Sequence, residues 1–245
     1  ISEDGTGGKQ MTRFLIEDEF WALFPQARIG VVLCHDMDNT GGDTGKYERM
    51  LRQAEEEAHK YFEQEEFSSN PVIAVWREAF RKFKTKKGAR ASIEALLKRV
   101  QNGGRIGNIN PLVDIYNSIS LKYGLPCGGE DMDTFSGDLR LTTADGSEPF
   151  VPLGEEENLP PYEGEIVYKD DAGAVCRCWN WRESSRTILT EKTKNAFLCI
   201  ESIDEGRRNI LDAALADLAG LAAEHLGGRV TTWILDQDNR EIRIL

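Results

Sequence analysis

Apolar residues recur at every third or fourth position in five stretches of the chain, and this spacing predicts amphipathic helices. Two stretches begin at an Asn-Pro pair, at Asn70 and at Asn110, where asparagine can cap a helix and proline fits its first turn. Glycine pairs at 103–104 and 227–228 predict helix ends. The predicted helices are Lys46–Phe67, Asn70–Lys84, Ile93–Val100, Asn110–Tyr123 and Arg207–Leu226.

Short runs rich in β-branched and apolar residues, bounded by turn residues, predict strands. Thr231–Leu235 and Glu241–Ile244 flank the polar turn DQDN, which predicts a hairpin. The other predicted strands are Ala27–His35, Asp138–Thr143, Glu165–Tyr168, Ala174–Cys178 and Asn195–Ile200. Because most helices precede most strands and no repeat or low-complexity linker occurs, we expect one α+β domain over residues 11–245.

The first ten residues, ISEDGTGGKQ, are polar and lack the apolar core of a signal peptide. We expect a cloning remnant or a disordered segment there, before a native start at Met11. No apolar run approaches the ~20 residues of a bilayer span, so we expect no membrane contact. The five cysteines are an odd number, which favours free thiols and a cytoplasmic protein.

The charge is unevenly distributed along the chain. There are 30 basic and 42 acidic residues, a net charge of −12, which argues against a protein that coats nucleic acid. Within Arg77–Arg99, however, nine basic residues face two acidic ones, so this segment carries +7 and the remainder −19. A solvated helix end is the plain interpretation. The alternative is phosphate binding by Arg81, Lys82, Lys84, Lys86, Lys87 and Arg90.

Two possible metal motifs fail on spacing. Cys176 and Cys178 form one ligand pair, but no second pair exists to complete a zinc site. The loop that starts at Asp36 resembles a calcium loop but has Tyr47 where the bidentate glutamate is needed. We therefore expect neither a metal nor another cofactor.

The stretch Cys178–Thr187, CWNWRESSRT, combines flat apolar side chains with polar donors. Strand alternation would place Trp179 and Trp181 on one face, and Asn180 and Arg182 on the other. This mixture is suited to a pocket for a polar ligand that carries a ring or a ribose. The alternative is a pair of core tryptophans followed by a polar turn.

The segment Asn110–Glu130, NPLVDIYNSISLKYGLPCGGE, resembles a motif of the beta subunit of phenylalanyl-tRNA synthetase. That motif is approximately N-x-V-V-D-V-T-N-Y-V-M-L-E-x-G-Q-P-x-H-A-F-D. The matching residues are Val113, Asp114, Asn117, Leu121, Gly124, Pro126 and Asp131. The similarity continues at 137–139, 170–171 and 191–195, so it covers about 110–201. It marks the B-three/B-four (B3/4) domain, which hydrolyses misacylated tRNA.

The whole chain, including NPVIAVWREAFRKF and SIEALLKR, is similar to free-standing proteins built around this domain. The resemblance implies an α+β fold of three layers, with a β-sandwich of unusual topology and additional N-terminal helices. It also implies contact with the acceptor end of tRNA. We infer no obligate protein partner.

Only some residues of the family's editing pocket have a match in this sequence. Asn117 and Pro126 match, whereas Tyr116 replaces a threonine and Gly128 replaces a histidine. The glycine-rich turn G-x-M-G-G falls at about Asn180–Ser184 and is NWRES here. The last-strand glutamate aligns to Cys199; Glu201, two residues on, shares that strand face and could substitute. These departures argue against a tyrosine-specific site but keep the pocket.

The resemblance implies an aminoacyl-tRNA deacylase acting in trans. We expect Asn117 and Asn180 to position water, together with the terminal 2′-hydroxyl of the tRNA. Glu201 or Glu130 would orient the substrate amine or a water. The expected substrate-binding residues are Tyr116, Pro126, Gly128, Glu130, Trp179, Trp181, Arg182 and Arg186. The expected RNA contacts are the six cations from Arg81 to Arg90. Two alternatives remain: a non-catalytic module for tRNA ends or amino acids, and a small-molecule hydrolase or binder.

Overall fold

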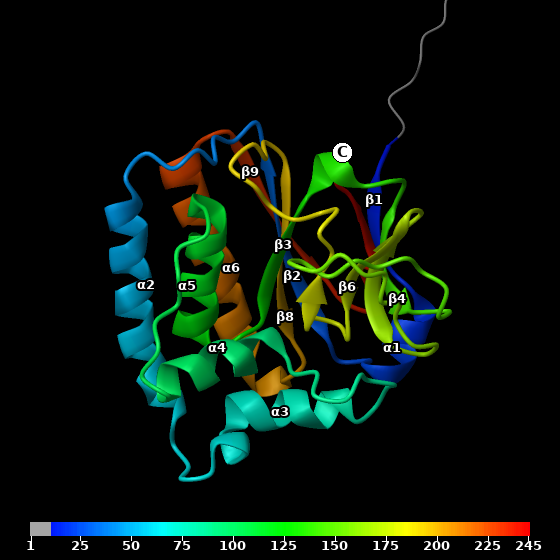
Figure 1. The fold of residues 1–245 in the computed structure, drawn as a ribbon, viewed down its shortest axis with the longest axis horizontal. Coiled ribbons are helices and arrows are strands. Elements are labelled where there is room, and N and C mark those ends of the chain that lie inside the picture. The colour runs from blue at the N-terminus through cyan, green and yellow to red at the C-terminus, as the bar shows by residue number, and fades with distance from the viewer. Residues whose placement is uncertain (1–10) are drawn as a thin grey trace, which may run out of the picture.

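The computed structural model describes residues 11–245, so the expectation for residues 1–10 lies outside the described part. Two β-sheets pack face to face, and helices cover the outer face of one sheet, giving three layers (Figure 1). The covering helices are α5 (Pro111–Tyr123) and α6 (Arg208–Leu226), and α2 (Thr44–Ala58) packs against α5. Helices and strands are thus combined in separate layers, which confirms the predicted α+β class.

The four-stranded sheet lies in the middle layer and is antiparallel throughout. Its order is β3 (Cys127–Asp131), β8 (Ala196–Ser202), β2 (Arg28–His35) and β9 (Arg229–Leu235). Every residue of β8 is buried, because helices cover one face of this strand and the second sheet covers the other. This position explains why the strand is apolar along most of its length rather than alternating.

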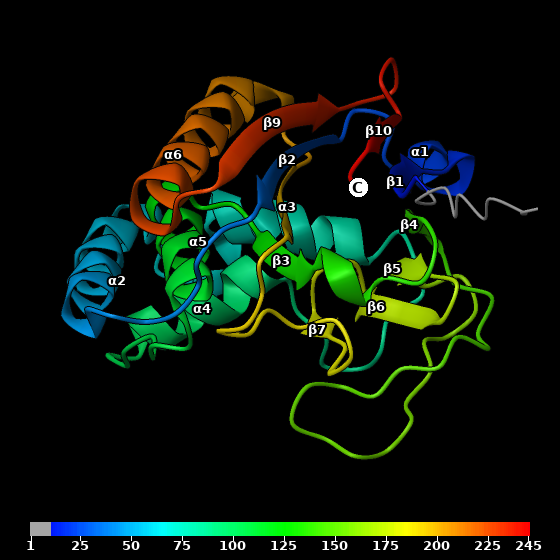
Figure 2. The same cartoon turned by 90° about the horizontal axis from the view of Figure 1, so that it is seen from above.

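The six-stranded sheet forms the outer layer (Figure 2). Its order is β10 (Glu241–Arg243), β1 (Arg13–Ile16), β4 (Leu139–Thr143), β5 (Ile166–Asp170), β6 (Gly173–Arg177) and β7 (Arg182–Glu183). Only β1 and β4 run parallel; the other described pairs are antiparallel. β1, β3 and β7 were not predicted, since each is short and lacks a clear alternating pattern.

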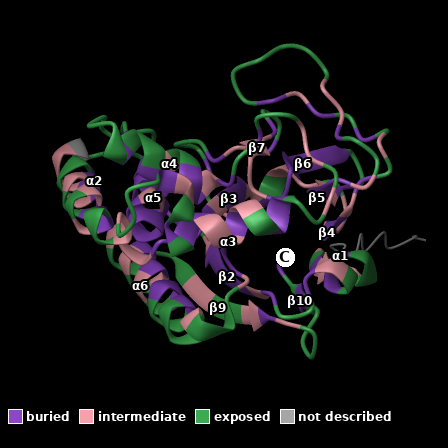
Figure 3. Ribbon diagram, turned by 90° about the horizontal axis from the view of Figure 1, so that it is seen from below, coloured by how far each residue is buried: buried purple, intermediate pink, exposed green. Residues whose placement is uncertain are grey.

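The buried side chains form two clusters, one on each side of the middle sheet. Between the sheets, the rings of Phe14 and Phe197 meet edge to face with centroids 4.9 Å apart. Under the helices, Leu112 and Ile119 of α5 and Leu215 of α6 are buried in the second cluster. The outward faces of α2 and α6 are exposed (Figure 3). Within residues 11–245 no helix is long and apolar enough to cross a membrane.

Three further helices close one end of the sandwich: α1 (Asp18–Leu23), α3 (Pro71–Phe80) and α4 (Ser92–Gln101). Single 3₁₀ turns are found at His59–Tyr61, Phe67–Ser69, Met132–Thr134 and Glu205–Arg207. The buried Glu94 of α4 joins this region, because it accepts a hydrogen bond from Arg77 Nε of α3 at 3.1 Å and pairs with Arg90 at 3.6 Å. The segment between the two helices is thereby fixed at both ends.

Two predicted helices extend too far. The first ends at Ala58 rather than Phe67, because the Asn70 side chain accepts hydrogen bonds from the backbone of Glu63 and Gln64 at 2.7 and 2.8 Å and holds a turn there. Asn70 therefore does not cap α3 with its side chain. The second ends at Phe80 rather than Lys84, since the chain turns so that Phe83 packs against Phe24.

The predicted C-terminal hairpin is wrong. β9 pairs with β2 in the middle sheet, and β10 pairs with β1 in the outer sheet. The turn between Asp236 and Asn239 carries the chain from one sheet to the other. The turn itself was recognisable from DQDN, but the choice of partner depends on contacts far apart in the sequence.

Candidate functional site

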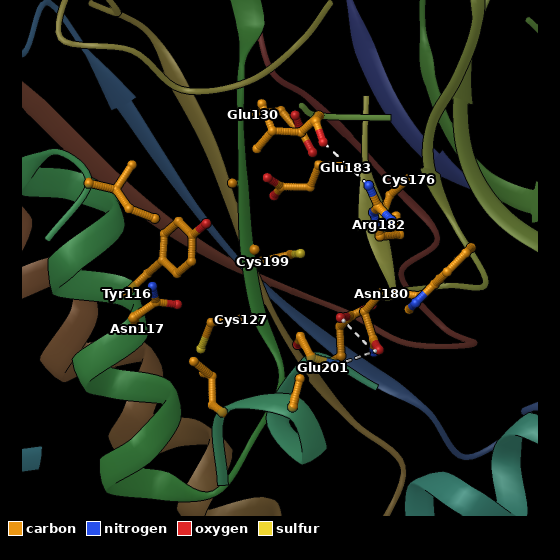
Figure 4. Close-up of a pocket in the computed structure, with 18 of the residues that line it drawn as sticks. Tyr116, Asn117, Cys127, Glu130, Cys176, Asn180, Arg182, Glu183, Cys199 and Glu201 are labelled. Atoms are coloured by element: carbon orange, nitrogen blue, oxygen red, sulfur yellow. Dashed lines mark hydrogen bonds between the residues drawn. The ribbon is translucent and has the colours of Figure 1, made fainter. Parts of the chain in front are cut away.

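A cavity of about 770 Å³ opens between elements of both sheets and two helices. Its walls come from α4 and α5, from β3 and β8 of the middle sheet, and from β5, β6 and β7 of the outer sheet. Figure 4 shows Tyr116 and Asn117 on one side of it and Asn180 and Arg182 on the other. Its exposed rim includes Arg99, Asn108, Ile109 and Leu153.

Helix α5 contributes Tyr116 and Asn117. The helix starts as predicted, because the Asn110 side chain accepts a hydrogen bond from the backbone N–H of Val113 at 3.1 Å. The side chains of Tyr116 and Asn117 make no hydrogen bond to the described residues, so both can bind a ligand. Burial, together with the nearby Glu183 and Glu130, raises the pKa of Tyr116 well above its usual value.

Strand β3 leaves space where the resembled motif has a histidine. A methyl group added at Gly128 would meet only Cys199 Sγ at 3.8 Å and Glu183 Oε1 at 4.0 Å. At Gly129 it would collide with Leu198 at 2.6 Å and Leu189 at 2.8 Å. Gly128 therefore opens the cavity, whereas Gly129 is required for packing.

Glu201 is the most firmly held polar group in the cavity (Figure 4). Its carboxylate accepts hydrogen bonds from Tyr168 Oη at 2.8 Å and from Asn180 Nδ2 at 3.2 Å. Burial raises the pKa of Glu201 to about 8, against the opposing effect of these two hydrogen bonds. Pro126 does not line the cavity, but its carbonyl accepts the Glu201 N–H at 3.0 Å and so helps to position this residue.

The segment Cys178–Trp181 is a turn, so the predicted strand alternation of its two tryptophans is wrong. Cys178 and Trp179 have φ values of 45° and 63°, a left-handed conformation that costs about 1–3 kcal/mol per non-glycine residue. Trp179 is fully buried among aromatic rings of Phe20, Phe24 and Trp76, at centroid distances of 4.9, 4.7 and 4.9 Å. This packing holds the strained turn at the cavity wall.

The turn also connects the cavity to α4. Asn180 Oδ1 accepts a hydrogen bond from the backbone N–H of Ser92, the first residue of α4, at 3.3 Å. Because Asn180 Nδ2 donates to Glu201, one side chain connects helix α4 to the buried carboxyl group. A displacement of α4 or of the Glu201 carboxyl group would therefore be transmitted to the other through Asn180.

The arginines near this turn have separate roles. Arg182 lines the cavity, stacks near the ring of Trp181 at 5.6 Å and pairs with the exposed Glu155 at 3.2 Å. Arg186 does not line the cavity. It binds both carboxylate oxygens of the buried Asp170 at 2.8 and 2.7 Å, since a buried carboxylate needs a charged partner.

Several cavity residues were not anticipated from the sequence. Glu183 follows Arg182 on β7, and although part of it remains accessible, surrounding protein atoms raise the pKa of its carboxyl to about 7. Tyr168 and the thiols of Cys127, Cys176 and Cys199 also line the cavity. Glu183 belongs to the unusual stretch CWNWRESSRT, so the composition of that stretch was a usable signal. Tyr168 and the three cysteines had no such signal in the sequence.

The cavity offers no activated nucleophile of the usual kind. Burial raises the pKa of the Cys199 and Cys176 thiols well above their normal value, so both are protonated at neutral pH. No histidine or serine–histidine pair lines it. In the described range, 11–245, no group of three His, Cys, Asp or Glu residues is arranged to hold a metal ion.

The basic segment is partly neutralised. Arg81 pairs with Glu78 at 2.9 Å and Arg90 with the buried Glu94. Lys82 and Lys84 lie over the rings of Phe24 and Tyr162, both at 5.6 Å. Lys86 and Lys87 have no ion-pair partner among the described residues and border a separate hollow of about 250 Å³.

Phe80 is buried in the core and Phe83 packs against it partly buried, with ring centroids 5.3 Å apart.

Comparison with known proteins identifies the family. An N-terminal fragment of the phenylalanyl-tRNA synthetase beta subunit from Pyrococcus horikoshii is similar in structure, with a TM-score of 0.42 and 13% identity. The match covers 97% of this chain and 55% of that fragment, so the chain spans about half its length. No curated protein matches. The sequence model of the B3/4 domain matches residues 75–215, more than half of the chain, and the chain therefore belongs to the B3/4 domain family.

Proposed function

We propose that the cavity binds the aminoacyl end of a charged tRNA and hydrolyses the ester when the amino acid is wrong. The observation that carries this proposal is an open cavity lined by Asn117, Asn180 and Glu201, with the exposed Arg99 at its rim. At about 770 Å³ it is large enough for an amino acid and part of a terminal adenosine. Membership of the B3/4 family agrees with this use.

Ester hydrolysis needs a positioned water and donors for the oxyanion. Asn117 has a free side-chain amide that would hold the water or the carbonyl oxygen, and the terminal 2′-hydroxyl of the tRNA would assist. Asn180 and Glu201 would orient the substrate at the opposite wall. Because the pKa of Glu201 is raised to about 8, it would act as a protonated hydrogen-bonding group near pH 7, not as a general base.

The remaining cavity residues would shape the substrate site. Tyr116 and Gly128 set its width, and the half-buried Trp181 offers apolar surface at the turn that the buried Trp179 holds. Arg182 would reach the terminal phosphates. Lys86 and Lys87, on the neighbouring loop, would contact the acceptor stem.

The test is deacylation of a panel of mischarged tRNAs. We expect at least one to be cleared faster than its spontaneous rate, and Asn117→Ala to slow that clearance by about tenfold or more. Asn102→Ala, an exposed asparagine at the end of α4, is the matched control and should have no effect. If no tRNA in the panel is cleared faster than spontaneously, the enzymatic proposal is wrong.

The alternative is a non-catalytic module that holds tRNA ends or amino acids. The favouring observation is that Glu201 and Asn180 already bond to each other and to Tyr168 and Ser92, which leaves them poorly available to activate water. Salt-dependent tRNA binding without deacylation would select this alternative.

A further inference from the structure

We propose that Glu130 and Glu183 form a binding site for the side-chain ammonium of a basic amino acid, at the end of the cavity away from Glu201. The inference rests on the proposed function, because it names the class of aminoacyl group that the cavity accepts. Figure 4 shows the two carboxylate side chains side by side, apart from the Asn180–Glu201 pair.

The first observation is that neither carboxyl group has a cationic partner among the described residues, although Glu183 accepts a backbone hydrogen bond from Gly129. Glu130 is only 6% exposed, and its Oε2 is buried with no hydrogen-bond donor. Thr187 lies nearby, but its hydroxyl is likewise unpartnered, so the two groups do not meet at normal hydrogen-bond geometry. Neither Glu130 nor Glu183 forms an ion pair with any residue of the range 11–245. A buried carboxylate without a partner is costly, and a bound cation would relieve the cost.

The second observation is that the surrounding charges leave the site acidic. Arg186 acts on Glu130 from outside the cavity, but its guanidinium is held by Asp170. Asp131 adds a further negative charge, and the Tyr116 hydroxyl lies between α5 and the pair with no hydrogen bond of its own. Burial and the Glu183 carboxylate raise the pKa of Glu130 well above its normal value, a shift that a neighbouring ammonium would reverse.

The third observation is the distance along the sheet. Glu130 lies opposite Phe197 in the β3–β8 register, and Glu201 lies four residues further along β8. At about 3.3 Å per residue, the two glutamates are roughly 13 Å apart along the strand direction. An α-ammonium is bonded to the carbon next to the ester, so it stays near the reacting end. Only a cation at the tip of a side chain can reach Glu130 from an ester held beside Asn180 and Glu201.

The test is calorimetric binding of three amides to the full chain: L-lysinamide, L-norleucinamide and 6-aminohexanamide. Amides, like the ester, lack the α-carboxylate. We expect lysinamide to bind at least about tenfold more tightly than norleucinamide, and 6-aminohexanamide to follow lysinamide. Glu130→Gln and Glu183→Gln should reduce this preference to near unity. Glu156→Gln, at an exposed glutamate outside the cavity, should leave it unchanged.

Equal binding of lysinamide and norleucinamide by the wild type would overturn the proposal, and this comparison requires no variant to fold. A preference that survives both substitutions in proteins of unchanged melting temperature would also overturn it. If the substitutions weaken norleucinamide as much as lysinamide, the pair binds the α-ammonium and the side-chain assignment is wrong. None of these results depends on deacylation, so failure of the enzymatic proposal remains a separate outcome.

Discussion

At the scale of single residues, the cavity is distinguished by three carboxyl groups whose pKa is raised by burial. Glu201 is almost completely buried and is held by Tyr168 and Asn180. Glu183 and Glu130 line the same cavity without an ion-pair partner among residues 11–245, and Glu183 accepts a backbone hydrogen bond from Gly129. In all three, burial favours the neutral form, so these groups couple folding and ligand binding to pH.

We expect the free energy of unfolding to fall as the pH rises from about 5 to 8. An unfolded glutamate ionises near pH 4.5, whereas Glu201 ionises near 8 when folded, so between these values the folded chain binds more protons. Glu201→Gln should remove a pH-dependent loss in the free energy of unfolding on the order of 3–5 kcal/mol. Urea denaturation of the wild type and the variant at several pH values measures this loss. A variant whose pH dependence equals that of the wild type would contradict the assignment.

The two glycines of β3 give a second prediction at this scale. Gly128→Ala should fold normally, because its methyl group has space, and should weaken ligand binding by narrowing the cavity. Gly129→Ala should lower stability by about 1–3 kcal/mol through its collision with Leu198 and Leu189. Thermal melting of both variants checks this, and an equal loss of stability in the two would show that the described geometry is incorrect.

At the scale of elements, the cavity depends on helix α4 being held in place. Its first residue bonds to Asn180, and its buried Glu94 pairs with Arg77 and Arg90. These links attach α3, the basic loop and the strained turn to one helix.

We expect Glu94→Gln to destabilise the protein by about 1–3 kcal/mol, because it weakens charge-assisted hydrogen bonds at a buried position. Glu78→Gln, which breaks an exposed pair with Arg81, is the control and should cost less than about 1 kcal/mol. Chemical denaturation gives both values. Similar losses in the two variants would mean that Glu94 has no special role.

The helices and strands also show which features local sequence signals can predict. The Asn110 cap and the Gly124 end of α5 are local signals, and the helix between them was predicted within one residue of its observed bounds. The partner of β9 and the end of α2 depend on distant contacts, namely pairing with β2 and the side chain of Asn70, and were missed. In the cavity, motif similarity identified Asn117, but Glu183 and Tyr168 are brought in only by the packing of the two sheets.

At the scale of the whole molecule, the net charge of −12 restricts where RNA could bind. Most cations of the segment Arg77–Arg99 are paired or lie over aromatic rings, which leaves Lys86 and Lys87 on the loop, and Arg99 at the cavity rim, as its clearest candidates. An acidic protein with one local basic loop would hold a single end of an RNA and repel the rest.

Charge reversal at this loop, Lys86→Glu with Lys87→Glu, should weaken tRNA binding by about tenfold at low salt, equally for all tRNAs. It should also reduce the salt dependence. Lys192→Glu, at an exposed lysine of another loop, is the control. Filter binding over a range of salt concentrations measures both effects, and an unchanged affinity would remove this loop from the interface.

The central claim is that the aminoacyl group itself enters the cavity. The most direct measurement compares the affinity of the protein for an uncharged tRNA and for the same tRNA carrying a stable amide-linked amino acid, with wild type and Gly128→Leu. The account predicts tighter binding of the charged tRNA by the wild type, and loss of that difference when leucine fills the space beside Cys199. Equal affinity of the wild type for charged and uncharged forms, over a panel of amino acids that includes lysine, would contradict it.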